Sequence, residues 1–201
     1  RRIVHWSSPW PVQRSSSGTF IVDEQPSLVE SAAQPRRSTP APKRIAVVIH
    51  ELVVHKNRAL FGADIRVDAL FITPTRPQDH QYHAGTLTFK NVRDGDRLPL
   101  DQVLVYLGPV RDFLQVCLWV SRDPGQSLAL SALLASAAQS KEVKDALGAL
   151  AGLALAAPQA ALAVGAAGAA LTLADIGYRL LTSAVGHSIG VYRTSLLAID
   201  C

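Results

Sequence analysis

Two histidines and a glutamate in the segment HELVVH come nearest, by type and spacing, to a catalytic metal site. His50, Glu51 and His55 form a His-Glu-x-x-x-His pattern. It is one residue longer than the His-Glu-x-x-His helix in which two histidines bind zinc and the glutamate is the general base. That chemistry needs both histidines on one helical face, whereas the surrounding β-branched residues favour a strand. On a strand the odd spacing places the histidines on opposite faces. A zinc-dependent hydrolase is therefore only the alternative function.

A second candidate for a functional element, this time for binding a membrane or a partner, is the uncharged run 146–174. It is dominated by alanine, leucine and glycine. Its 29 residues exceed the roughly 20 that span a bilayer. Pro158, however, divides the run into two short halves, which favours a helical hairpin. We expect the hairpin to pack on itself or on the domain, with conditional membrane insertion or partner binding as the alternative. Its apolar stripe is the candidate membrane- or partner-binding surface and comprises Leu147, Leu150, Leu153, Leu162, Leu171 and Leu173.

Residues 1–43 are rich in proline and serine, which indicates an N-terminal linker or docking segment. Within it, GTFIV (18–22) is a candidate edge strand or docking peptide. Residues 44–201 form the folded domain. Its first segment, IAVVIHELVVH, predicts one long strand, and helical composition follows over about 127–184 before strand composition returns in SIGVYRTSLLAI.

Alternation in ADIRVDALFIT predicts a strand with Ile65, Val67, Ala69 and Phe71 on one face and the charged residues on the other. The segments VLVYLG and FLQVCLWV predict two more strands, separated at Gly108-Pro109. If LQVCLWV is a central strand, Cys117 is buried and unreactive.

The order of these segments resembles the C2 family of β-sandwich domains. The resemblance rests on IAVVIHELVVHKNRALFGADIRVDALFI, on FLQVCLWVSRD and on HSIGVYRTSLL. It implies an α+β chain: a C2-like antiparallel β-sandwich with a helical-hairpin insertion. The hairpin would then project from the third of the loops at one tip, the end that binds calcium and touches membranes in that family.

The same resemblance brings Asp64 and Asp123 to the loops that hold calcium in C2 domains. Asn57, Ser121 and Ser188 stand where further acids are common, and Ca²⁺ takes six to eight oxygen ligands. Two carboxylates are too few for a tight site, so we expect no cofactor.

The composition sets limits on the class of function. A net charge of +4 permits attraction to anionic lipid but argues for no nucleic acid, and two cysteines form no disulfide framework, which favours a reducing compartment. The absence of an initial methionine and the alanine-, arginine- and glycine-rich composition indicate a piece of a larger bacterial protein. We expect a non-catalytic interaction or membrane-targeting module, cytoplasmic or peripheral to a membrane. Its partner would be the rest of the polypeptide, another protein or an anionic membrane, and no small-molecule substrate is indicated.

Overall fold

Antiparallel strands and three helices make up the part of the chain that the computed structural model describes: residues 19–22, 43–74, 81–100, 102–110, 113–155, 160–186 and 188–197. The architecture is α+β, as the sequence predicts. The strands are β1 (Thr19–Val22), β2 (Lys43–Ile49), β3 (Val53–Val54), β4 (Ala63–Ile72), β5 (Tyr82–Val92), β6 (Asp96–Arg97), β7 (Val103–Val110), β8 (Phe113–Arg122) and β9 (Ser188–Leu197). The helices are α1 (Leu130–Ala137), α2 (Lys141–Leu155) and α3 (Ala160–Val185).

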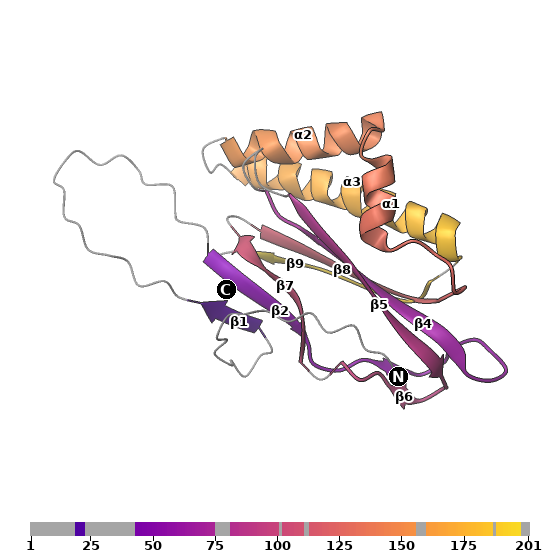
Figure 1. Ribbon diagram of the computed structural model, residues 1–201. Helices are drawn as coiled ribbons and strands as arrows, with labels where there is room; N and C mark the ends of the chain where they lie inside the picture. The colour runs from indigo at the N-terminus through magenta and orange to yellow at the C-terminus, as the bar shows by residue number, and fades with distance from the viewer. Residues whose placement is uncertain are drawn as a thin grey trace, which may run out of the picture.

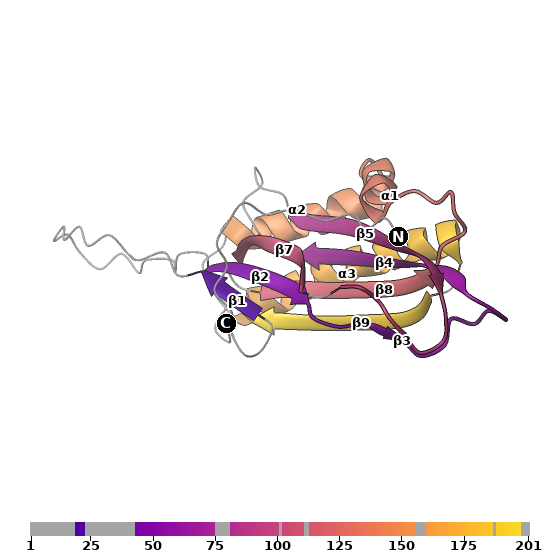
Figure 2. The ribbon, with the colours of Figure 1, turned by 60° about the horizontal axis from the view of Figure 1, so that its bottom comes forward.

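The strands form two main sheets and one short ladder. The larger sheet has the order β5-β4-β8-β9, the smaller sheet has the order β1-β2-β7, and β3 pairs with β6. All neighbouring strands are antiparallel. Figure 1 shows the helices over one face of the larger sheet, and Figure 2 shows β1, β2 and β7 on the side away from them.

The first of two apolar cores lies between the two sheets. On β4 it takes Ile65, Val67, Ala69 and Phe71, the four residues that the alternation predicts to share a face. Side chains of the smaller sheet, such as Ile45, complete this core. Burial of this face is what holds the two sheets together.

The second core lies between the opposite face of the larger sheet and the helices. It contains Leu70 and Trp119 from the sheet together with Leu150 and Leu173 from the helices. A Cβ atom at Gly177 of α3 would lie 3.3 Å from Leu70 Cδ2, so the glycine lets this helix approach the sheet closely. Both faces of the larger sheet are therefore covered.

This arrangement corrects the expected place of the helical insertion. The insertion begins and ends close to the predicted 127–184, and its helices α2 and α3 form the expected hairpin, with α1 added before them. It does not project from the end of the sheets. It lies along the larger sheet, because its apolar side chains pack against that sheet's second apolar face.

Two strand predictions also need correction. The segment IAVVIHELVVH is not one strand: β2 ends at Ile49, and β3 begins at Val53 and pairs with β6 while β2 pairs with β7. The chain leaves one ladder for another, which local sequence does not reveal. The second correction concerns VLVYLG, whose strand is predicted to end at Gly108-Pro109. Strand β7 continues through Pro109, where a proline is tolerated because β7 is an edge strand.

Two other predictions are confirmed. GTFIV contributes the edge strand β1, and β8 lies centrally between β4 and β9. Cys117 of β8 is fully buried, and burial raises the pKa of its thiol. Both features keep the thiol protonated and inaccessible.

Candidate functional site

Two adjacent apolar side chains in the loop between β3 and β4 are the most exposed large hydrophobic residues of the described chain. Leu60 is 96% exposed and Phe61 is 85% exposed. The loop projects beyond the end of the larger sheet (Figure 2). We call residues 57–62 the tip loop, and Leu60 with Phe61 the tip pair. Because the two side chains are exposed together, they offer one apolar surface to a partner.

Asn57, which is buried, fixes the conformation of the tip loop. Its Nδ2 donates to the carbonyl oxygens of Phe61 and Val92, each at 2.8 Å, and its Oδ1 accepts from the N–H of Ala59 at 2.8 Å. The backbone N–H of Asn57 donates to Asp94 Oδ1 at 2.7 Å. The Asn57 side chain thus holds the loop against β5, and its backbone N–H holds it against the turn that follows β5. The tip pair is therefore exposed on a backbone fixed by hydrogen bonds.

Gly62 packs closely against the side chain of Asn91 at the base of the loop. A Cβ atom at Gly62 would lie 2.0 Å from Asn91 Oδ1, well inside contact distance. Asn91 itself has a φ of 53°, in the left-handed region that asparagine tolerates better than most residues. A larger residue at position 62 would therefore displace the Asn91 side chain.

Asp64 marks the boundary between the tip loop and the sheet. Its carboxylate accepts from Lys90 Nζ at 2.8 Å and from the Asn91 N–H at 3.0 Å. The hydrogen bond from Lys90, followed by that from Asn91, holds the pKa of Asp64 below its usual range. Its backbone oxygen accepts from the Asp123 N–H at 2.7 Å, which joins the start of β4 to the loop after β8.

Charged side chains of both signs lie at this end of the molecule. Four exposed cations lie in the tip loop, beside it or at the adjoining end of β8: Lys56, Arg58, Arg93 and Arg122. None of the ion pairs found among the described residues involves them. The carboxylates of Asp94, Asp96 and Asp123 lie at the same end and accept hydrogen bonds from neutral donors, as Asp96 does from the Arg93 N–H at 2.7 Å, so they keep their negative charge. The tip pair is therefore flanked by cationic side chains.

A buried ion pair lies on the helix-facing side of β4. Arg66 Nε donates to Asp68 Oδ2 at 2.7 Å and Arg66 Nη2 to Asp68 Oδ1 at 2.6 Å, with both side chains almost fully excluded from solvent. Arg66 also donates to Ser127 Oγ and to the Leu128 carbonyl. The pair thus fastens the loop after β8 to the sheet.

Thr86 of β5 connects this ion pair to α1. Its hydroxyl donates to Asp68 Oδ1 at 2.6 Å and accepts from the N–H of Leu130, the first residue of α1, at 2.9 Å. Ala129 supplies no side-chain cap to that helix, so a threonine from a distant strand satisfies one of its free N–H groups. The network is structural: it fixes where the helical layer begins.

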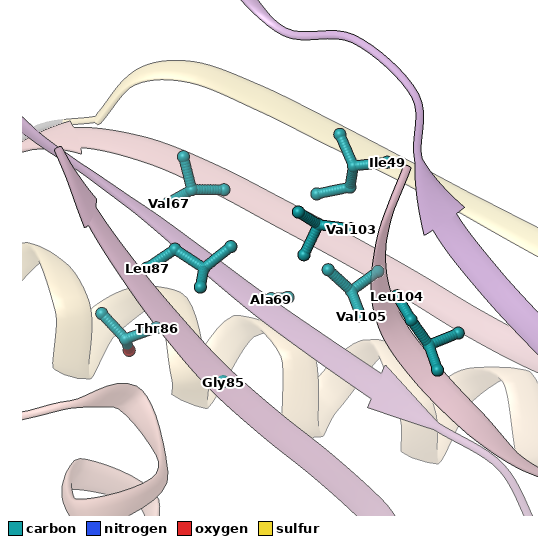
Figure 3. Close-up of a pocket in the computed structure, with 9 residues that line it drawn as sticks. All are labelled: Ile49, Val67, Ala69, Gly85, Thr86, Leu87, Val103, Leu104 and Val105. Atoms are coloured by element: carbon teal, nitrogen blue, oxygen red, sulfur yellow. The ribbon is translucent and has the colours of Figure 1, made fainter. Parts of the chain in front are cut away.

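An apolar pocket opens between β5 and β7 (Figure 3). Val67 and Ala69 of β4 line it together with Leu87 and Val105 of the two flanking strands. Its cavity volume is about 20 Å³, and a single water needs roughly 10–15 Å³ by the same measure. A pocket of this size has no room for an organic substrate.

The predicted zinc ligands do not lie on a helix. His50 follows β2, Glu51 lies in the link to β3, and His55 follows β3, and all three are exposed. The Glu51 carboxylate forms an ion pair with Arg97. Nowhere in the described ranges do three His, Cys, Asp or Glu side chains gather in an arrangement that could hold a metal ion.

The predicted calcium residues Asp64 and Asp123 do come together, at the base of the tip loop. Their carboxylates, however, face protein donors: Asp64 accepts from Lys90, and Asp123 Oδ1 accepts from Ser127 Oγ at 3.0 Å and from the Gly125 N–H at 3.1 Å. This donor set suits a cross-braced loop more than a cation site, which needs carboxylate oxygens free to ligate.

The predicted leucine stripe is divided between the core and the surface. Leu150 and Leu173 are fully buried against the sheet, Leu147 packs partly against the same core, and Leu171 is exposed. Leu153 lies in α2 and Leu162 in α3, but their side chains are outside the described part of the structure. Among the helical residues that the structure describes, no helix is long and apolar enough to cross a membrane.

Neither the tip pair nor the buried ion pair is expected from the sequence patterns considered above. A signal for the tip pair exists, because Leu60 and Phe61 stand between an asparagine and a glycine in an otherwise polar turn. The pattern Arg66-x-Asp68 gives no such signal, since charges alternating with apolar residues normally indicate a solvated face.

No protein-family model, no curated protein and no solved structure matches this chain.

Proposed function

We propose that this chain is a non-catalytic membrane-targeting module that docks on an anionic bilayer surface through the tip pair. The observation that carries the proposal is the exposure of Leu60 and Phe61 on a loop fixed by the buried Asn57. A partner with an apolar interior and an anionic surface matches both the side chains and the cations around them. A lipid bilayer has that composition.

The magnitudes support a reversible contact. Moving a Leu or Phe side chain from water into an apolar phase is worth about 1.5–3 kcal/mol each. Each nearby Lys or Arg adds about 1 kcal/mol at an anionic surface. Because the tip loop is already ordered, little conformational entropy is lost on docking. These terms give membrane affinity without insertion of a helix.

The helical layer has a packing role in this proposal. Leu150 and Leu173 fill the core against Leu70 and Trp119, so transfer of the hairpin into lipid would uncover one whole face of the larger sheet. The tip pair can enter a membrane without loss of any core contact. Docking by the tip is therefore favoured over insertion of the hairpin.

The finer fold assignment is part of the same proposal. We infer a C2-like sandwich in which the helical insertion covers the outer face of one sheet. Two antiparallel sheets around a shared core support it, as does the contact between the start of β4 and the loop after β8 through Asp64 and Asp123. The module would belong to a larger bacterial protein that it brings to the membrane. No observation favours the zinc hydrolase.

Vesicle flotation tests the proposal. The comparison uses anionic and neutral vesicles with the wild-type chain, with Leu60→Ser/Phe61→Ser, and with a matched control, Val191→Ser/Tyr192→Ser. The control pair is also adjacent and apolar, at 58% and 56% exposure, but lies on β9. We expect the wild type and the control to float with anionic vesicles, less so at high salt, and the tip variant to remain in solution.

Flotation of the tip variant at the wild-type level would overturn the proposal. So would failure of the wild type to float with either vesicle, which would leave the tip pair to a protein partner. Replacing the hairpin with a short loop is a poor test, because it would expose the second core.

A further inference from the structure

Strand β9 is the outermost strand of the larger sheet on the side away from β5 (Figure 2). Among the described strands, none pairs with its outer edge. Two adjacent apolar residues of this strand, Val191 and Tyr192, are 58% and 56% exposed. We propose that the edge is an interaction surface for a second copy of the chain, whose own β9 pairs with it antiparallel around a two-fold axis.

The exposed residues of β9 lie on both faces of the larger sheet, because adjacent residues of a strand point to opposite faces. Val191 lies opposite Trp119, which belongs to the core beneath the helices. Tyr192 lies opposite Leu118, which packs on the core between the sheets. Neither covering layer therefore buries this edge, and a strand that pairs with it must carry apolar residues toward both faces.

The sequence of β9 meets this requirement by its symmetry. Residues 191–197 read V-Y-R-T-S-L-L, which is two apolar residues, three polar residues and two apolar residues, with Thr194 at the centre. In a pairing that places Thr194 opposite Thr194, Tyr192 of each copy lies opposite Leu196 of the other. Val191 lies opposite the residue that follows Leu196. Apolar residues thus meet on both faces, and this self-complementarity is what a two-fold interface requires.

The features that usually protect an edge strand do not block this one. The symmetric segment contains no proline and no acidic residue. Its one cation, Arg193, donates to Asp175 Oδ1 of α3 at 2.9 Å and contacts the Cys117 thiol of β8, so its charge is directed back over the sheet of its own chain. The bulge in the β8–β9 ladder falls at Ile189, and pairing is regular from Gly190 to Leu197.

Gln115 of β8 fixes the centre of the edge strand. Its Nε2 donates to the Thr194 carbonyl oxygen at 3.0 Å, and its Oε1 accepts from the Ser195 hydroxyl at 2.5 Å. A carbonyl oxygen has two acceptor positions, so this bond does not by itself block pairing with a further strand. Because β9 is ordered before pairing, little conformational entropy is lost when a second copy binds.

Sedimentation equilibrium tests the pairing. The wild-type chain is compared with Val191→Ser/Tyr192→Ser and with a matched control outside β9, Leu60→Ser/Phe61→Ser. Each substitution acts twice in a symmetric dimer, so we expect the β9 variant to raise the dimer dissociation constant at least about tenfold. The tip variant should dimerise as the wild type does. A wild type that stays monomeric up to millimolar concentrations would overturn the proposal, as would a dimer that the β9 substitutions do not weaken.

A cysteine at the centre of the segment tests the register without removing either apolar residue. In Thr194→Cys with Cys201→Ser, the two new thiols face each other across the axis, within the range of a disulfide. We expect a yield of interchain disulfide several-fold above that of Lys144→Cys, an exposed position on α2, in the same background. Circular dichroism checks that both variants are folded. Equal yields would overturn the pairing around Thr194.

The two tip loops of such a dimer lie at opposite ends, because the axis reverses the strand direction and each tip loop lies at the end where β9 begins. On the proposed function, on which this step rests, one dimer joins two bilayers. The turbidity of anionic vesicles should therefore rise with the wild type and not with Val191→Ser/Tyr192→Ser, although both float. Equal turbidity would contradict this arrangement, whereas a wild type that dimerises but does not float would contradict only the membrane proposal.

Discussion

Asn57 shows how one buried side chain determines the exposure of two others. Its amide satisfies two carbonyl groups and one N–H that would otherwise be left without partners in the turn. Together with the bond from the Asn57 N–H to Asp94 Oδ1, these bonds fix the backbone on either side of Leu60 and Phe61. The apolar surface at the tip is thus a consequence of polar groups beneath it.

Replacing Asn57 with alanine should therefore affect both stability and binding. We expect the free energy of unfolding to fall by about 2–3 kcal/mol, because buried backbone groups lose their hydrogen bonds. Vesicle binding should weaken as well, since the loop would sample other conformations. Chemical denaturation measures the first effect and flotation the second. A change in stability below about 0.5 kcal/mol, the usual range for surface substitutions, would show that Asn57 does not hold the loop.

Tyr106 gives a prediction about pH. Burial raises the pKa of its phenol to about 12, and its hydroxyl donates to the Pro109 carbonyl oxygen at 3.3 Å. The folded-state pKa lies above the unfolded value of 10. The contribution of the protonated Tyr106 phenol to the stability of the fold is therefore fully present below pH 10. It is lost as the pH rises toward 12.

We expect one of the four tyrosines to ionise last in a spectrophotometric titration of the native protein. That late step should be missing in Tyr106→Phe, and the loss of stability above pH 10 should be smaller in this variant. An unchanged titration curve in Tyr106→Phe would contradict the burial of this hydroxyl.

At the scale of elements, β4 illustrates what the sequence predicts well and what it does not. Alternation correctly identifies the strand and the four apolar residues of its first face. The second face carries Arg66 and Asp68, and this pattern predicts a solvent-exposed face. Helices nevertheless cover it, because the two charges form an ion pair with each other. The sequence does not predict the end of β2 at Ile49, because the β-branched residues that follow are also typical of a strand. The change of ladder is visible only from the pairing of β3 with β6.

Removing one partner of the Arg66–Asp68 pair should lower the free energy of unfolding far more than replacing both residues with apolar ones. Asp68→Ala leaves a buried guanidinium without its carboxylate, and we expect the free energy of unfolding to fall by about 3–5 kcal/mol. The double variant Arg66→Met/Asp68→Leu should recover most of that loss, because apolar groups fill the same space. Denaturant titrations of both variants measure their free energies of unfolding. A double variant as unstable as Asp68→Ala would mean that the charges themselves hold α1 in place.

At the scale of the whole molecule, the helices and the smaller sheet cover opposite faces of the larger sheet and leave the tip loop projecting at one end (Figures 1 and 2). The existence and approximate limits of the helical layer follow from composition. Its position does not, because it depends on which apolar face of a distant sheet the helices meet. The functional prediction changes accordingly. Of the predicted leucines whose side chains the structure describes, Leu147, Leu150 and Leu173 pack in the core, so we propose the tip pair for the binding role.

The most direct test compares the membrane contact of three positions in one experiment. An environment-sensitive fluorophore is attached to Phe61→Cys, Leu171→Cys or Tyr192→Cys in a Cys201→Ser background, since Cys117 is buried and does not react. The three positions report on the tip loop, the helical layer and β9. On addition of anionic vesicles we predict a shift to shorter emission wavelength, and quenching by lipid-borne quenchers, at position 61 only. Such changes at position 171 or 192 with none at position 61 would contradict docking through the tip.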